Sequence, residues 1–392
     1  MAKGKIFSLV LVVLLAGAAV PQAAETGPAV SALREPQGGE PSRTTEWDRT
    51  IRAAQKEGQL AVYMWRLESL DKTVQAFQKK YPEIRITSVA LRGAELAARL
   101  MTERRAEKFL WDVCICGTTT PYKVFHQGKA LDPIKAALIL PEVADESKWW
   151  GGKHHYVEPE QQYIFIFVGN VMGDVVSYNT TLVNPREFTS FWDLLQPKWK
   201  GKIVAKDPRV PGSGAGNMRW IYYHPKLGAT FLKRLFGEME VTLSREERQA
   251  VDWLAKGKAA LCFSCGQTDT IRAKQQGLPV EMFNSAPWKE GAGMNAQVNT
   301  VALLNKAPHP NAARFFTNWL LSREGQTIYQ ELAVSSGSPS ESLRVDVPKE
   351  VIPPIYRRVP GVDYVMVDRA EWMEMAPIYG VISEALERAA KK

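Results

Sequence analysis

From Thr45 onward, hydrophobic positions follow two different periods along the chain. Steps of three and four, as over residues 70–81, predict amphipathic helices. Short runs that are apolar throughout, such as 113–116, predict strands covered on both faces. Since these runs alternate with helices, the pattern predicts an α/β protein with mostly parallel sheets flanked by helices.

The predicted elements divide into helices and strands as follows. Helices are expected between Thr45 and Gly58, over 70–81, 94–105, 190–195, 213–223, 227–236 and 245–256, and from Pro310 onward. Strands are expected over 60–65, 84–89, 113–116, 163–178, 203–205, 259–263, 280–283 and 298–304.

The first 24 residues have the pattern of an export signal. Lys3 and Lys5 precede an apolar run over 6–20, and small residues end at Ala24. That run is shorter than the about 20 residues that a membrane-spanning helix needs. We therefore expect a cleaved signal peptide over 1–24 and a periplasmic protein that does not span the membrane. Residues 25–44, rich in Pro, Gly, Ser and Glu, are expected to be a flexible leader.

The chain that follows is too long for one ordinary core and suits two domains. The glycine-interrupted stretch over 163–178 predicts one crossing between them, and 298–304 predicts the return. The expected segments are 45–168 for the first part of lobe 1, 169–297 for lobe 2, 298–345 for the return segment of lobe 1, and 346–392 for a C-terminal helical tail.

Composition excludes some partners and favours others. Hydrophobic residues make up 45% and charged residues 23% of the chain, as in globular proteins. The net charge of +8 is spread along the sequence without a basic and aromatic cluster, so nucleic acid is not expected as a partner. A mildly positive surface favours anionic ligands.

Several short segments, in order, carry a resemblance to a known family. They lie at 53–58, 76–82, 194–202, 307–313 and 319–326, within a span from Trp47 to Asp346. In these segments the chain resembles type II periplasmic solute-binding proteins of ABC importers, closest to the subgroup of iron(III)-binding proteins. The resemblance implies two lobes joined by crossing strands, a ligand held between them, and a membrane permease as partner. We further expect a non-enzymatic, monomeric receptor without a cofactor.

Ligand contacts are expected beyond the carboxyl ends of the strands, where helix N-termini offer free N–H groups. The candidate ligand-binding residues are Arg66, Glu68, Ser69, Arg92, Thr118, Thr119, Thr120, Asp207, Arg209, Ser213, Gly214, Gln267, Thr268, Asp269 and Asn299. Arg66, Arg92 or Arg209 would pair with an anionic group, because guanidinium binds carboxylate and phosphate bidentately. Plain helix capping, a glycine turn and solvated loops are the alternative interpretations of these positions.

Iron(III)-binding members of the family that this chain resembles often use adjacent tyrosinates as ligands. The segment after strand 259–263 has no tyrosine, and the adjacent pair Tyr222 and Tyr223 lies on a predicted helix. Neighbouring helical side chains point about 100° apart, so packing against the core is favoured over chelation of one ion. No metal site is predicted.

Four cysteines form two local pairs, Cys114 with Cys116 and Cys262 with Cys265. Buried thiols or a local disulfide are favoured over a soft-metal site. His154 and His155 follow a polar glycine loop and are expected at the surface.

The first hypothesis is therefore the substrate-binding component of an ABC importer for a small polar or anionic solute. Binding would close the lobes by a hinge motion. The alternatives are an iron(III)-binding transport protein, and an exported sensor module or enzyme on the same scaffold. The sequence contains no Gly-x-Ser-x-Gly, His-Glu-x-x-His or P-loop motif to support an enzyme.

Overall fold

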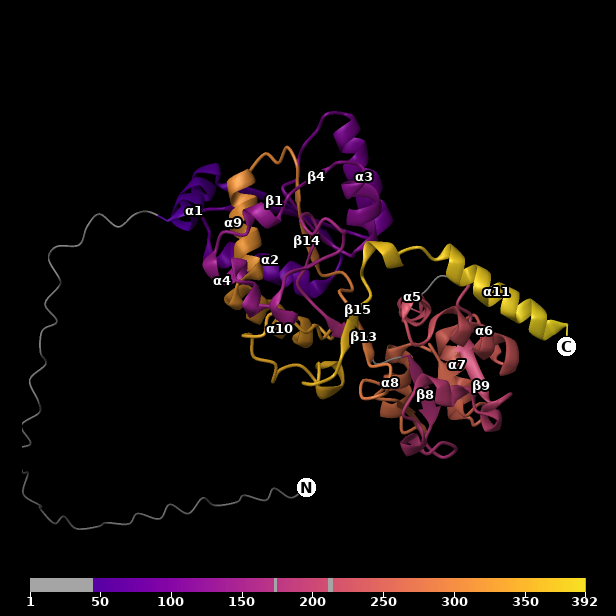
Figure 1. Cartoon of the computed structure of the whole chain (residues 1–392). Helices are drawn as coiled ribbons and strands as arrows, with labels where there is room; N and C mark the ends of the chain where they lie inside the picture. Colours follow the sequence, from indigo (N-terminus) through magenta and orange to yellow (C-terminus); the bar gives the residue numbers. More distant parts are fainter. Residues whose placement is uncertain (1–44, 173–174, 211–213, 392) are drawn as a thin grey trace, which may run out of the picture. The chain divides into compact units, whose positions relative to one another are not determined.

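Residues 45–172, 175–210 and 214–391 are described by the computed structural model (Figure 1). The expected signal peptide, the expected leader and Ser213 lie outside these ranges. Within them, none of the helices is both long and apolar enough to cross a bilayer.

The first sheet contains the earliest strands of the described chain. Its order is β2 (Arg85–Leu91), β1 (Gln59–Trp65), β3 (Val113–Cys116), β14 (Thr300–Leu304), β6 (Phe165–Ile166) and β5 (His155–Tyr156), with β4 (Leu131–Asp132) also paired to β14. β1, β2 and β3 pair in parallel, whereas β14 is antiparallel to its neighbours.

The second sheet has the order β10 (Thr242–Ser244), β9 (Ile203–Lys206), β11 (Leu261–Phe263), β8 (Val176–Asn179) and β12 (Val280–Met282). β10, β9 and β11 are parallel, and β8 is antiparallel to both neighbours. The α/β class is confirmed, and both large sheets are mixed, with parallel pairing confined to three strands in each.

A third, small sheet contains β15 (Tyr364–Met366), β13 (Ala292–Asn295) and β7 (Asn170–Val171). The chain passes from the first sheet through β7 to the second, and returns through β13 to β14. β15 adds a later segment of the chain in parallel to β13. No sequence pattern predicted β15.

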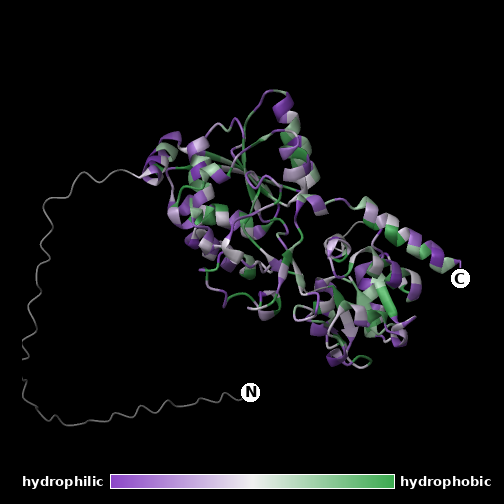
Figure 2. Ribbon diagram, viewed as in Figure 1, coloured by the Kyte–Doolittle hydropathy of each residue, from purple (hydrophilic) through white to green (hydrophobic). Residues whose placement is uncertain are grey.

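Helices pack against both sheets and present apolar faces inward (Figure 2). With the first sheet lie α1 (Glu46–Glu57), α2 (Glu68–Lys80), α3 (Gly93–Arg105), the short α4 (Pro141–Ala144), α9 (Pro310–Leu321) and α10 (Arg323–Ser335). With the second lie α5 (Ala215–Tyr223), α6 (Gly228–Glu238), α7 (Glu247–Ala255), α8 (Gln267–Gln275) and α11 (Ala376–Ala390). Segment 190–195 forms a short 3-10 helix over Phe191–Leu195 in place of the predicted α-helix.

Local sequence signals set these boundaries. Thr45 and Asp48 form a capping box at the start of α1, and Gly58 ends it in the left-handed region at φ 65°. Each large sheet has its own aromatic core. In the first, Phe77 packs edge-on against Phe315 with ring centroids 5.4 Å apart. In the second, Phe191 packs against Trp220 at 5.0 Å.

Candidate functional site

The carboxyl ends of β1 and β2 bring two predicted arginines to one edge of the first sheet. Trp65 pairs with Leu91, so Arg66 and Arg92 follow neighbouring strands in register. Both side chains are exposed. Glu68, in contrast, forms an ion pair of 2.7 Å with Lys72 one turn along α2.

The threonine segment after β3 lies at the same edge. A Cβ on Gly93, next to Arg92, would come within 2.8 Å of Thr120 Oγ1, so Thr120 lies against the start of α3. Thr119 is exposed. Thr118 is buried and donates a hydrogen bond of 3.1 Å to Asp368 Oδ1. Thr118 therefore has a structural partner already.

Ser69 and Asn299 lie in the interior, beside the hydroxyl of Tyr329. The Tyr329 hydroxyl donates to Asn299 Oδ1, and burial raises the pKa of this tyrosine to about 12. Ser69 is fully buried next to the same hydroxyl. These two residues support the packing of α2 and α10 under the strand ends.

In the second sheet, Asp207 and Arg209 pair with each other at the carboxyl end of β9. The Arg209 Nε and Nη2 atoms donate to the two carboxylate oxygens at 2.9 and 2.8 Å. The hydrogen bonds from Arg209 hold the pKa of Asp207 below its ordinary value. The charge of Arg209, which was predicted to pair with an anionic ligand, is therefore largely balanced by Asp207.

Two helix N-termini converge on Ser264, which follows β11. A Cβ on Gly214, the residue before α5, would lie 2.7 Å from Ser264 Oγ. Asn217 in the first turn of α5 donates to the same oxygen at 3.1 Å. α8 begins at Gln267, three residues after Ser264, and the Gln267 amide nitrogen is buried without a hydrogen-bond partner among the described residues.

Thr268 and Asp269 belong to the same first turn of α8. Thr268 is exposed, and Asp269 pairs with Arg272 along the helix at 3.3 Å. Asp269 thus stabilises α8 and its charge is directed toward the helix surface.

Lys206, the last residue of β9, completes this group and was not predicted as a site residue. Lys206 is 7% exposed. Among the described residues, no group forms a hydrogen bond or an ion pair with its side chain. It lines a cavity of about 10 Å³ together with Asp207, Gly214 and Ser264. The sequence did contain one signal for this residue, because a lysine stands directly after an apolar run that was predicted to be a buried strand.

Arg219 and Asp368 were also missed. Arg219 on α5 approaches Asp368 Oδ1 at 3.5 Å, the same oxygen that accepts from Thr118. Asp368 Oδ2 accepts from the Ala296 backbone N–H at 2.7 Å. Asp368 follows β15 by two residues, so it links elements from both large sheets. Because these partners lie far from Asp368 along the chain, no local sequence pattern could predict the contacts.

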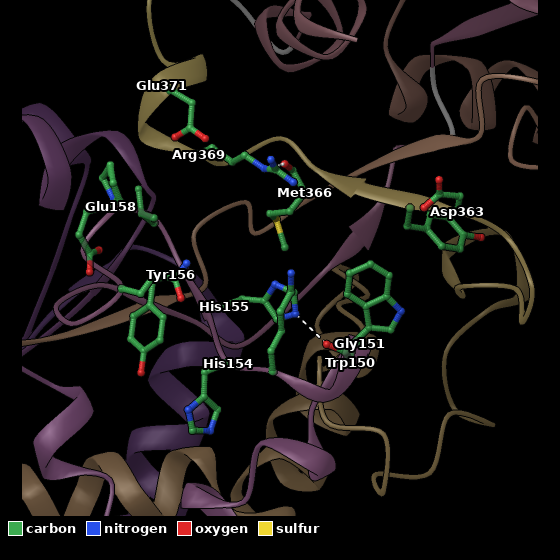
Figure 3. Close-up of a pocket in the computed structure, with 15 residues that line it drawn as sticks. Trp150, Gly151, His154, His155, Tyr156, Glu158, Asp363, Met366, Arg369 and Glu371 are labelled. Carbon is green, nitrogen blue, oxygen red and sulfur yellow. Dashed lines mark hydrogen bonds between the residues drawn. The ribbon is translucent and has the colours of Figure 1, made fainter. Parts of the chain in front are cut away.

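A separate cavity of about 440 Å³ lies between residues 150–161 and 363–371 (Figure 3). None of the predicted ligand-binding residues lines it. His154 and His155 were expected at the surface, but they are 7% and 8% exposed, and that prediction was wrong. His155 Nε2 donates to the Trp150 carbonyl oxygen at 2.8 Å, and His154 packs against Trp149. These contacts with backbone and aromatic groups bury both imidazole rings, whereas the neighbouring glycines alone suggested that the rings would be exposed to solvent.

The cysteine pairs differ from each other. Cys262 and Cys265 form a disulfide, whereas Cys114 and Cys116 are free buried thiols with their sulfurs 3.2 Å apart. Both outcomes were among those expected.

Tyr222 and Tyr223 pack against the core of the second sheet, as predicted. Their rings stand at 85° to each other, and the Tyr223 hydroxyl donates to the Glu374 carbonyl oxygen at 3.1 Å. Over the described ranges, no group of three or more His, Cys, Asp and Glu side chains is arranged to hold a metal ion.

Comparison with known proteins adds relatives of three kinds. The family described as bacterial extracellular solute-binding protein matches residues 153–331. An uncharacterized protein of Haemophilus influenzae is 25% identical over 301 residues, which cover 74% of this chain and 80% of the relative.

Solved structures of similar fold include two proteins described with iron. IdiA (FutA) of Trichodesmium, in complex with iron and citrate, has a TM-score of 0.56 and 19% identity, covering 85% of this chain and 99% of that one. Iron-bound HitA of Pseudomonas aeruginosa has a TM-score of 0.52 and 18% identity, covering 83% and 99%. Apo FutA2 of Synechocystis PCC6803 has a TM-score of 0.58 and 17% identity, covering 84% and 98%.

At these identities the solved structures show the fold alone: the chain has the periplasmic binding protein fold that the resemblance led us to expect, and residues 153–331 are similar to bacterial extracellular solute-binding proteins.

Proposed function

We propose that this chain is the periplasmic substrate-binding component of an ABC importer and that its solute carries an anionic group. The group would bind where α5 and α8 begin, around Ser264. Free N–H groups and the positive ends of two helix dipoles favour an anion at such a position. The convergence of two helix N-termini on one hydroxyl is the observation that carries this proposal.

The nearby side chains have suitable chemistry. Lys206 supplies a positive charge that makes no hydrogen bond or close ion pair within the described chain, although it acts electrostatically on Asp207, and Gln267 supplies an amide donor that lacks an acceptor there. A bound carboxylate or phosphate would accept from both. Arg66 and Arg92, exposed at the strand ends of the first sheet, are the proposed contacts for the rest of the solute.

Export through a signal peptide cleaved after Ala24 belongs to the same proposal, as do delivery to a membrane permease and a monomeric state. N-terminal sequencing of protein purified from the periplasmic fraction should begin at Glu25. Retention of the uncleaved chain in the cytoplasm would contradict this part.

The test of the solute class is a thermal-shift screen of the purified mature protein. Inorganic phosphate, citrate, phosphorylated sugars and small carboxylates should raise the melting temperature, and neutral sugars of equal size should not. Mass spectrometry of whatever co-purifies with the native protein would identify the solute. If no anion raises the melting temperature, the proposed anion site is refuted.

Transport of iron(III) is the second candidate, because the structurally similar proteins of Trichodesmium and Pseudomonas aeruginosa are described with bound iron. The stacking of Tyr223 on Trp372, with ring planes 10° apart, disfavours a tyrosinate chelate at this pair. A stabilising effect of ferric citrate, with none from citrate alone, would favour iron.

A further inference from the structure

We propose that the disulfide between Cys262 and Cys265 positions the anion site. It holds the backbone between β11 and α8 so that Ser264 and the first turn of α8 meet the start of α5. This inference rests on the proposed function for its consequence in binding, while its structural part can be measured without any ligand.

The backbone that the disulfide encloses has an unusual conformation. Ser264 has φ 57°, in the left-handed region that serine rarely adopts. Gly266, directly before α8, has φ 86°. The Ser264 N–H donates to the carbonyl oxygen of Val175, the residue before β8, at 2.7 Å, so the turned segment is also tied to the chain that enters β8. Two left-handed residues within three positions reverse the chain from strand into helix.

The bridge is anchored where it cannot easily shift. Cys262 and Cys265 are both fully buried, in a cluster that includes Val204 of β9, Val251 of α7 and Ala273 of α8. Since Ser264 lies between the two bonded cysteines, its φ angle cannot relax to negative values without moving this buried bridge. The disulfide therefore fixes a conformation that the serine alone would leave.

The site depends on that conformation. Ser264 Oγ accepts from Asn217 of α5 and lies against Gly214, and both contacts require the side chain to leave the backbone in the present direction. α8 starts three residues later, so the orientation of its free N–H groups follows the same turn.

A general stabilising role is the competing explanation. The disulfide closes a loop around only two residues, and short loops restrict the unfolded chain little. Its main effect is therefore expected in the local geometry of residues 264–270. Cys114 and Cys116 offer a matched control, since they are also a buried pair at the carboxyl end of a strand but remain unbonded.

Hydrogen exchange of the ligand-free protein tests the structural part. In the variant Cys262→Ala/Cys265→Ala, the amides of Thr270 and Ile271 in the first hydrogen-bonded turn of α8 should exchange at least tenfold faster. Wild-type protein refolded with a phosphine reductant should behave in the same way. The variant Cys114→Ala/Cys116→Ala should match the wild type over 264–272. Equal exchange in all proteins would overturn the inference.

Calorimetric titration with inorganic phosphate tests the consequence for binding. The disulfide-free variant should bind phosphate about tenfold more weakly than the wild type.

A glycine at position 264 separates the positioning role from other effects of the disulfide. Adding Ser264→Gly to the disulfide-free variant should restore slow hydrogen exchange over 264–272, because glycine adopts positive φ readily. The same change in the wild type should give no such gain. An identical effect of Ser264→Gly in both backgrounds would refute the positioning role. If wild-type protein binds no anion, the proposed function fails, and the exchange data still decide the role of the disulfide.

Discussion

Acidification should destabilise this protein through His155. The residue is 8% exposed, and its Nε2 donates to the Trp150 carbonyl oxygen. Burial lowers the pKa of His155 from the ordinary 6.5 to about 4, and the charges of Lys153 and Arg358 act in the same direction. The folded protein therefore holds this imidazole neutral at pH values where the unfolded chain protonates it.

The sign of the effect follows from this difference. Between pH 6.5 and about 4 the unfolded chain binds the additional proton, so the free energy of unfolding falls as the pH falls through this window. At pH 4.5 the loss from this one residue is about 2.5 kcal/mol, from 1.36 kcal/mol per unit of pKa difference and partial protonation of the folded state. The contribution is fully present above pH 6.5.

Urea unfolding at pH 7 and pH 4.5 measures this loss, with His155→Gln as the matched variant. Glutamine keeps an N–H donor for the Trp150 carbonyl and does not titrate. His154, whose pKa burial also lowers, remains in both proteins and cancels in the comparison. The variant should lose about 2.5 kcal/mol less than the wild type on acidification.

Equal losses in the two proteins would refute the reasoning. They would mean that the adjoining cavity of about 440 Å³, which His155 lines in Figure 3, admits enough water to hydrate the imidazolium. Its pKa would then lie near that of an exposed histidine.

Three further outcomes are expected. Asp368→Asn should lower the free energy of unfolding by roughly 1–3 kcal/mol in urea denaturation. An amide cannot accept hydrogen bonds from both Ala296 and Thr118, and its neutral side chain leaves Arg219 without an ion pair. Glu371→Gln, a change of the same kind at an exposed position, should alter the free energy of unfolding little. Lys206→Met should weaken phosphate binding about tenfold in calorimetry, unlike Lys202→Met at an exposed position, and equal affinities would exclude Lys206 from the site. Arg209→Gln should raise the pKa of Asp207 toward 3.8 in a carboxyl-carbon NMR titration, and an unchanged value would show that Arg209 is not its main partner.

The secondary structure was largely predictable because its signals are local. Thr45 and Gly58 bound α1 as expected, and the apolar run 113–116 forms β3 without a shift. β15 escaped prediction because its three residues gain their stability from pairing with β13, which lies about 70 residues earlier.

The candidate site was predictable only where it follows from strand ends. Gly214, Gln267 and the arginines Arg66 and Arg92 lie where the rule for α/β sheets puts ligand contacts. Whether the other candidate residues are available to a ligand depends on their partners within the protein. Arg209 pairs with Asp207, two positions away, and Thr118 donates to Asp368, 250 positions away. Neither partnership can be read from spacing.

The position of β15 and α11 has a consequence for biosynthesis. β15 completes the small sheet through which the chain passes twice, and α11 packs against α6 of the second sheet (Figure 1). Both segments emerge from the ribosome after every strand of the two large sheets. Neither the small sheet nor the helical cover of the second sheet can therefore be complete before β15 and α11 have been synthesised.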